Sequence, residues 1–225
     1  MHGKRWVWRM LVVGWFCLVG TGDATEIALK GVVFGDYYYH ASGANKQRNG
    51  FQIRRIYLTW DLERNDAFSG RVRLEAKDEG FGSGKKMTPF VKHAYVRYRK
   101  SGHALYLGLS GTPTWSVSEK VWGYRSVEKT AMDLYGIGSS TDIGVAFHGR
   151  LDGAGRANVQ LMLANGSGLT PESDTGKKAM GLRHIKPGGF EATVYADWES
   201  RAGAADRATF AGFLGRSDGD FRGGV

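Results

Sequence analysis

Residues 51–63 read FQIRRIYLTWDLE, and their alternation decides the fold class. The even-numbered positions from Ile56 to Leu62 are apolar, whereas the odd-numbered positions from Arg55 to Glu63 are polar or aromatic. Successive side chains of an extended strand point to opposite faces, so this pattern predicts a β-strand with one apolar face and one polar face.

The same period of two recurs along the chain. In residues 68–78 Val72 and Leu74 alternate with Arg71 and Arg73, and residues 90–100 and 190–199 repeat the pattern. We predict an all-β protein built of about ten antiparallel strands, near residues 27–40, 51–63, 68–78, 90–100, 104–111, 142–151, 156–165, 177–186, 190–199 and 207–215.

The connections between these strands alternate in length. Short turns at residues 64–67, 101–103, 152–155 and 187–189 alternate with longer loops at 41–49, 79–89, 112–141, 166–176 and 200–206. Outer-membrane barrels have short periplasmic turns and longer outer loops, and their tilted strands need about 9–11 residues. The pattern therefore predicts an antiparallel transmembrane β-barrel over residues 25–225. A secreted β-sandwich would explain the alternation but not the asymmetry of the loops.

The N-terminus has the features of an export signal. Lys4, Arg5 and Arg9 precede the apolar run 10–20 (MLVVGWFCLVG), and Gly22-Asp23-Ala24 supplies a small-x-small cleavage pattern. We expect a signal peptide over residues 1–24, because this run is too short to cross about 30 Å of hydrocarbon. Cleavage would remove the only cysteine and change the net charge from +9 to +7. We expect the exported chain to reside in the bacterial outer membrane.

The loop at residues 112–141 has an apolar half and a charged half. Its apolar residues include Trp115, Val121, Trp122 and Met132. Loops of this length in compact domains usually have a function. Its basic residues are Lys120, Arg125 and Lys129. We expect the apolar residues to pack on the inner wall of the barrel or on a neighbouring subunit and the basic ones to face the water path.

If the apolar face contacts lipid, the polar face lines a lumen with more arginine than carboxylate. Such a lumen attracts anions, and rings of arginine or lysine line anion pores. The expected lumen residues on the strands are Arg71, Arg73, Arg97, Arg99, Arg150 and Arg183. The alternative is that these charges pair into cross-strand ladders and only fill a narrow barrel.

Signals for other chemistries are weak. The histidines lie on different predicted strands and turns without metal-ligand spacing, so no metal or other cofactor is expected. Residues 80–86 (GFGSGKK) lack the first glycine and the final Ser/Thr of a phosphate-binding loop. No G-x-S-x-G motif is present, and we do not expect an enzyme. The spread of basic residues along alternate strand positions after an export signal argues against a nucleic-acid partner.

Three stretches resemble bacterial outer-membrane porins of the phosphate-selective O and P type. These are residues 50–76 (GFQIRRIYLTWDLE…FSGRVRLEA), 88–99 (TPFVKHAYVRYR) and 108–149, of which the part from Tyr124 to Val145 is the most specific. The resemblance implies a trimeric barrel whose long loop folds inward to narrow the pore. It also implies that Lys120, Arg125 and Lys129 belong to the constricting loop, and that Arg71, Arg73, Arg97 and Arg99 line a basic lumen.

The number of strands departs from that family. Such porins have about sixteen strands, whereas this chain has room for about ten. The chain also ends in GRSDGDFRGGV, without a final aromatic residue. We expect an incomplete product of a longer gene rather than a small plugged barrel, because unpaired sheet edges are not tolerated in lipid.

The expected function is passive diffusion of small anionic solutes such as phosphate across the outer membrane. The alternative is a secreted β-sheet module that binds sugar or peptide without channel activity. A third reading is a small closed barrel with an enzymatic or adhesive role on its outer loops.

Overall fold

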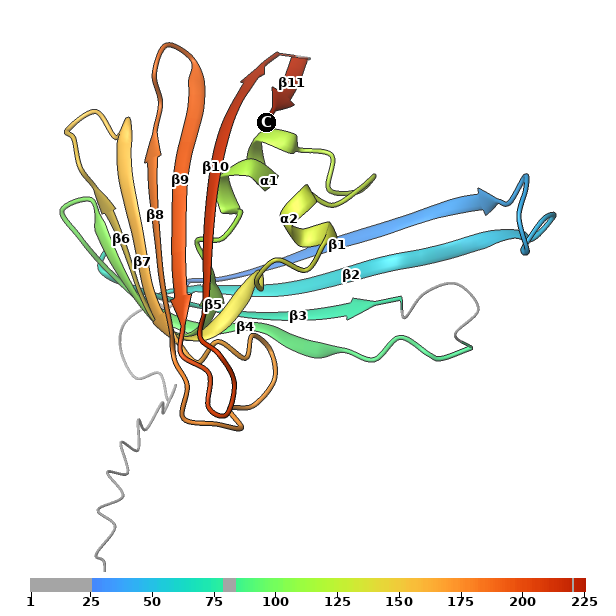
Figure 1. Cartoon of the computed structure of the whole chain (residues 1–225), viewed down its shortest axis with the longest axis horizontal. Helices are drawn as coiled ribbons and strands as arrows, with labels where there is room; N and C mark the ends of the chain where they lie inside the picture. Colours follow the sequence, from blue (N-terminus) through green and yellow to red (C-terminus); the bar gives the residue numbers. More distant parts are fainter. Residues whose placement is uncertain (1–25, 79–83, 220) are drawn as a thin grey trace, which may run out of the picture.

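The computed structural model describes residues 26–78, 84–219 and 221–225. They form one sheet of eleven strands with two short helices on one side (Figure 1). The prediction of an all-β class is confirmed. The predicted signal peptide (residues 1–24) and most of the glycine-rich stretch 80–86 lie outside the described residues. The strands are β1 (Glu26–Tyr39), β2 (Asn49–Glu63), β3 (Phe68–Lys77), β4 (Phe90–Lys100), β5 (His103–Gly111), β6 (Thr141–Arg150), β7 (Ala157–Ala164), β8 (Lys178–Ile185), β9 (Phe190–Glu199), β10 (Arg207–Asp218) and β11 (Phe221–Gly224).

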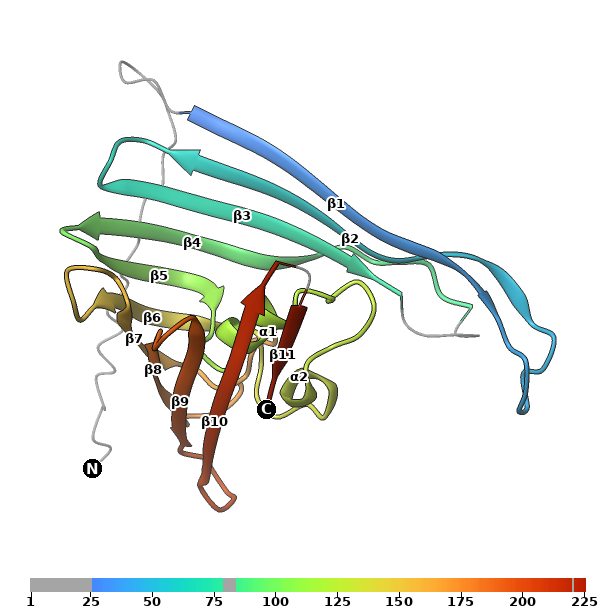
Figure 2. The same ribbon diagram turned by 90° about the horizontal axis from the view of Figure 1, so that it is seen from above.

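Each strand pairs antiparallel with its neighbours in the sequence, so the sheet is a meander (Figure 2). Short hairpin turns connect β2 to β3, β4 to β5, β6 to β7 and β8 to β9, and the longer loops join the strands at the opposite end. Within the described residues the sheet is not closed, because β1 and β11 are its two edges. The observed fold is thus an open antiparallel sheet.

All ten predicted strands are present, with bounds within a few residues of those expected. The eleventh strand was not predicted. It has four residues and pairs with only the last four residues of β10, which is too short to show a period of two.

Two helices interrupt the long loop: α1 (Ser116–Trp122) and α2 (Ala131–Leu134). They were not predicted. Val117 and Val121 lie one turn apart on α1, so both point to the same side, where they are buried. The helix ends at Gly123, whose φ of 66° is in the left-handed region that glycine adopts readily.

The sheet bends around α1 and α2 (Figure 1). We call the side that faces these helices the inner face, and the opposite side the outer face. The long loop lies on this inner side, and two of its apolar residues are buried there: Val121 is 3% exposed and Trp115 is 6% exposed. Trp122 differs, because it is 37% exposed.

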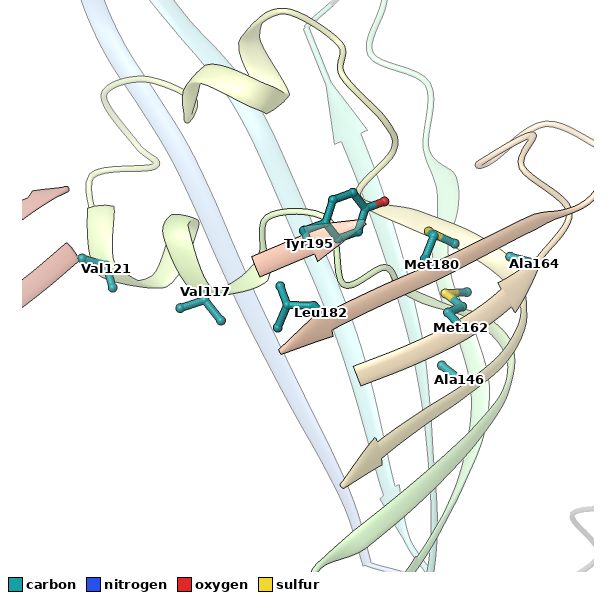
Figure 3. Packing of buried hydrophobic residues seen from close by; sticks show 8 residues of the cluster. All are labelled: Val117, Val121, Ala146, Met162, Ala164, Met180, Leu182 and Tyr195. Atoms are coloured by element: carbon teal, nitrogen blue, oxygen red, sulfur yellow. The ribbon is translucent and has the colours of Figure 1, made fainter. Parts of the chain in front are cut away.

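Buried apolar side chains gather between α1 and the inner face of the sheet from β6 to β9 (Figure 3). Partly buried Met132 and Phe213 pack against this cluster. The cluster consists of Val117, Val121, Ala146, Met162, Ala164, Met180, Leu182 and Tyr195. The inner face is consequently apolar under α1, whereas it is polar from β2 to β4.

The outer face is apolar and uncovered within the described residues. Leu163 is 59% exposed, Val194 is 68% exposed, and exposed apolar side chains continue on this face from β1 to β10. Apolar patches on soluble monomers rarely exceed a few hundred Å², and larger ones mark contacts with a protein partner, a ligand or a membrane.

Candidate functional site

On the inner face of β1 to β4, three carboxylates are each shared by two cations. Asp61 on β2 is the first. The Arg71 guanidinium donates to both of its oxygens, at 2.6 and 3.1 Å, and Lys30 Nζ lies 2.9 Å from Oδ2. Register brings these residues together, since Asp61 lies opposite Arg71 on β3 and Ala28, two residues from Lys30, on β1.

Glu63 forms the second group near the short-turn end. Arg97 Nη2 lies 3.1 Å from Oε1, and Arg99 Nη2 lies 2.9 Å from Oε2. Arg97 Nε also donates to Ser69 Oγ at 2.8 Å. The Glu63 side chain is 42% exposed, so water screens these two pairs.

Glu75 forms the third group and is almost fully buried. Arg55 Nε lies 3.2 Å from Oε1 and Lys92 Nζ lies 3.5 Å from Oε2. Lys92 also donates to Ser140 Oγ, at 2.7 Å, and so connects β4 to the end of the long loop. Lys92 reaches the inner face because the pairing of β3 with β4 shifts between Arg73 and Leu74.

Arg73 lies among these groups but forms no ion pair with any residue that the structure describes. Its Nε donates to Thr59 Oγ1 at 2.8 Å, and its guanidinium lies 5.3 Å from the centre of the Tyr57 ring. The three groups and Arg73 together comprise three carboxylates (Asp61, Glu63 and Glu75) and seven cations: Lys30, Arg55, Arg71, Arg73, Lys92, Arg97 and Arg99. We call these ten side chains the basic face.

Most of these cations form ion pairs across strands, as the alternative of cross-strand charge ladders expects. An excess of positive charge remains because each carboxylate serves two cations and Arg73 has none. Paired and partly buried cations of this kind are held in place by their partners, so the charge has a fixed position.

Two of the three basic residues of the long loop form ion pairs with Asp133. Arg125 Nη2 lies 3.0 Å from Asp133 Oδ2, and Lys129 Nζ lies 4.0 Å from Oδ1 of the same carboxylate. Lys120 is exposed and has no ion pair within the described part of the chain. Figure 1 shows α2, which carries Asp133, on the inner side of the sheet.

Arg150 and Arg183 lie on opposite faces of the sheet. Arg150 on β6 is on the inner face near the short-turn end, where it borders Gly102. Arg183 on β8 pairs with Val159 and Val194 and is exposed on the outer face. The assignment of Arg183 to the polar face is therefore wrong. The inner positions of β8 are Lys178, Met180, Leu182 and His184, so its inner face is mixed polar and apolar, and Arg183 lies on the other side.

The base of the loop is fastened to the sheet by a polar network that the sequence did not suggest. Tyr195 Oη donates to Asp197 Oδ2 at 2.5 Å and lies 3.4 Å from Thr114 Oγ1. Lys178 Nζ lies 3.3 Å from Asp197 and 3.4 Å from Glu199. All of these groups except Glu199 are buried. A buried polar network of this kind is rigid, so it holds the start of the long loop against the sheet.

Within the described residues no group of three or more His, Cys, Asp or Glu side chains could hold a metal ion. In the same part of the chain no helix is long and apolar enough to cross a membrane. The arrangement supplies fixed positive charge on one side of a sheet and an apolar surface on the other, with a loop packed on the charged side. No protein-family model and no curated protein matches this chain.

Proposed function

We propose that the chain is an outer-membrane β-barrel porin that passes small anionic solutes. The observation that carries this proposal is the opposition of the two faces: the outer face is apolar and exposed on strands from β1 to β10, while the inner face carries the charges. A transmembrane barrel needs this division, since its strands alternate between lipid and lumen.

Aromatic pairs at both ends of the strands support a membrane orientation. On the outer face the ring centres of Phe68 and Tyr98 lie 5.0 Å apart near the short-turn end. The ring centres of Tyr37 and Phe51 lie 5.1 Å apart near the long-loop end. Aromatic residues form girdles at the two membrane–water interfaces of outer-membrane barrels.

Selectivity for anions follows from the basic face. The excess cations are held by shared carboxylates and face the inner space, where low-dielectric walls focus their field. The loop narrows that space, since α1 is docked against β9 to β11 and α2 lies on the same side of the sheet. Phosphate and other small anions are the solutes that such a path favours over cations.

The proposal requires partners for the edges of the sheet. Backbone groups without a hydrogen bond in hydrocarbon cost several kcal/mol each. Within the described residues β1 has a strand on one side only, and β10 is covered on its second side only at its end. In the membrane these edges therefore pair with further strands, and the native complex should be resistant to detergent until heated.

The second candidate is a secreted β-sheet module that binds sugar or peptide. It is compatible with the hollows and aromatic residues of the sheet, but it leaves the apolar outer face in water. Cell fractionation separates the two: the porin is recovered in the outer membrane and needs detergent, whereas a secreted module is recovered in buffer.

Planar-bilayer recording of the detergent-purified protein tests the channel. We expect anion-selective conductance, and we expect the double variant Arg97→Glu/Arg99→Glu to shift the reversal potential towards cations. A matched control is Arg183→Glu, which changes charge on the outer face and should leave selectivity unaltered where the variant inserts. Absence of conductance or cation selectivity in the unchanged protein contradicts the proposal.

A further inference from the structure

A hollow of about 560 Å³ lies at the short-turn end of the sheet, next to the Glu63 group, whose Arg99 lines it. Its walls come from the end of β4, the start of β5, the end of β6, the start of β7 and the end of β8. It is therefore built by the turn between β2 and β3, the β4–β5 and β6–β7 hairpins and the end of β8.

The hollow exists because a small residue separates two large ones. Ala104 on β5 pairs with Arg99 on β4 and with His148 on β6, so the three side chains form one row on the inner face. The alanine methyl group leaves space between the guanidinium and the imidazole. The row continues to Gln160, which pairs with His148.

A second row closes the hollow on the side of the turns. Arg150 pairs with Asn158 on β7, and Asn158 pairs with His184 on β8. Gly102 keeps the turn close to Arg150, since a Cβ at this glycine would lie 3.1 Å from Arg150 Nε. The guanidinium is thus placed beside the turn at the rim of the hollow.

The charge of the lining is predominantly positive. Arg150 forms no ion pair and no hydrogen bond with the residues that the structure describes, and Arg99 shares Glu63 with Arg97. Asp66, on the turn between β2 and β3, is the one carboxylate that lines the hollow within the described residues. Glu191 lies outside the lining, beside His184.

The lining of the hollow also contains neutral hydrogen-bond donors. The Asn158 side chain is fixed by its bond to the Gly155 carbonyl at 3.0 Å. The carbonyl of the Gln160 side chain accepts from Ser116 Oγ at 3.5 Å, which leaves its amide protons for another acceptor. Guanidinium, amide and imidazole groups around one space are the donors that bind carboxylate and phosphate oxygens.

We propose that this hollow is a binding site for a small oxyanion, a solute with a carboxylate or phosphate group. Arg150 is the principal ligand, because its charge is not offset, and Arg99, Gln160 and His148 contact the same anion. The inference rests on the proposed porin function, in which this site is the last anion-binding site before the pore opens at the short-turn end of the strands. Binding is expected in the millimolar range, since a permeating solute has to leave again.

Calorimetric titration of inorganic phosphate into the detergent-solubilised chain tests the site. We expect Arg150→Gln to weaken binding about tenfold, as the loss of one charge-assisted pair predicts. Arg183→Gln is the matched control, because it removes the same charge from the outer face and should leave the dissociation constant unchanged. Ala104→Leu fills the hollow without a change in charge and should also weaken binding.

Circular dichroism of each variant verifies that the sheet is formed, and Ala104→Leu keeps the test decisive if Arg150→Gln does not fold. The site is contradicted if phosphate does not bind the unchanged protein, if Arg183→Gln weakens binding as much as Arg150→Gln, or if Ala104→Leu binds normally. Phosphate binding that depends on Arg150 in a protein that does not conduct overturns the porin but not the site. An anion-selective channel without such binding overturns the site alone.

Discussion

At the scale of single residues, Glu75 is the most buried of the three carboxylates on the basic face. Its side chain is 3% exposed and it serves both Arg55 and Lys92. Glu75→Gln leaves two partly buried cations without a carboxylate. We expect it to lower the free energy of unfolding by about 3–5 kcal/mol, measured by urea unfolding of the chain refolded into lipid vesicles.

Glu63→Gln is the control, because it also removes a carboxylate that two arginines share. Its side chain is 42% exposed, and exposed pairs contribute only about 0–1 kcal/mol. Equal losses of stability in the two variants would show that burial does not set the strength of these groups.

Arg73 offers the complementary case, since no carboxylate within the described residues depends on it. We expect Arg73→Gln to reduce anion selectivity while the free energy of unfolding changes by about 1 kcal/mol or less, the typical value of its hydrogen bond to Thr59. Reversal potentials and urea unfolding measure the two effects. Arg71→Gln should differ, because it deprives Asp61 of its two hydrogen bonds from Arg71.

Two residues show how far alternation alone could assign the site. Most of the basic strand positions follow from the period of two, because β2, β3 and β4 keep a polar inner face. Arg183 does not, because β8 has no purely polar face: Met180 and Leu182 lie on its inner side with Lys178 and His184, and Arg183 lies on the outer side. Lys92 was missed for another reason: the break in pairing after Arg73 turns it inward. The adjacent polar residues Lys92 and His93 within an alternating run were the available sign of such a bulge.

At the scale of elements, α1 holds the long loop on the inner face of the sheet. Val121 is 3% exposed between α1 and the sheet. Burial of a valine contributes about 1.5–3 kcal/mol, so Val121→Asp should release the helix. Trypsin cleavage after Lys120 and Arg125 should become faster, and single-channel conductance should rise. Val127→Asp is the control, because Val127 belongs to the same loop and is 74% exposed; a similar effect there would exclude docking as the cause.

Strands could be predicted and helices could not, and the difference is physical. A strand of ten residues repeats its two-residue period several times, whereas α1 has seven residues and α2 has four. A helix of one or two turns shows its 3.6-residue period too briefly to be recognised, and such short helices depend on tertiary packing for stability. The apolar half of the loop did indicate a packing surface, since Val117 and Val121 lie in the buried cluster, whereas the water path expected for its charged half stays a prediction.

At the scale of the whole molecule, the outer face distinguishes a membrane protein from a secreted sheet. Val194 lies in the middle of β9 on this face and is 68% exposed. In a bilayer Val194→Arg should destabilise the protein by about 2–4 kcal/mol, whereas on a solvated sheet the same change should stay within about 0.5 kcal/mol. Urea unfolding in vesicles measures the difference. Thr209→Arg, on the inner face of β10 opposite Asp197, is the matched control and should be tolerated. A Val194→Arg variant as stable as Thr209→Arg would mean that the apolar face does not meet lipid, and the secreted binding module would then be the better account of this sheet.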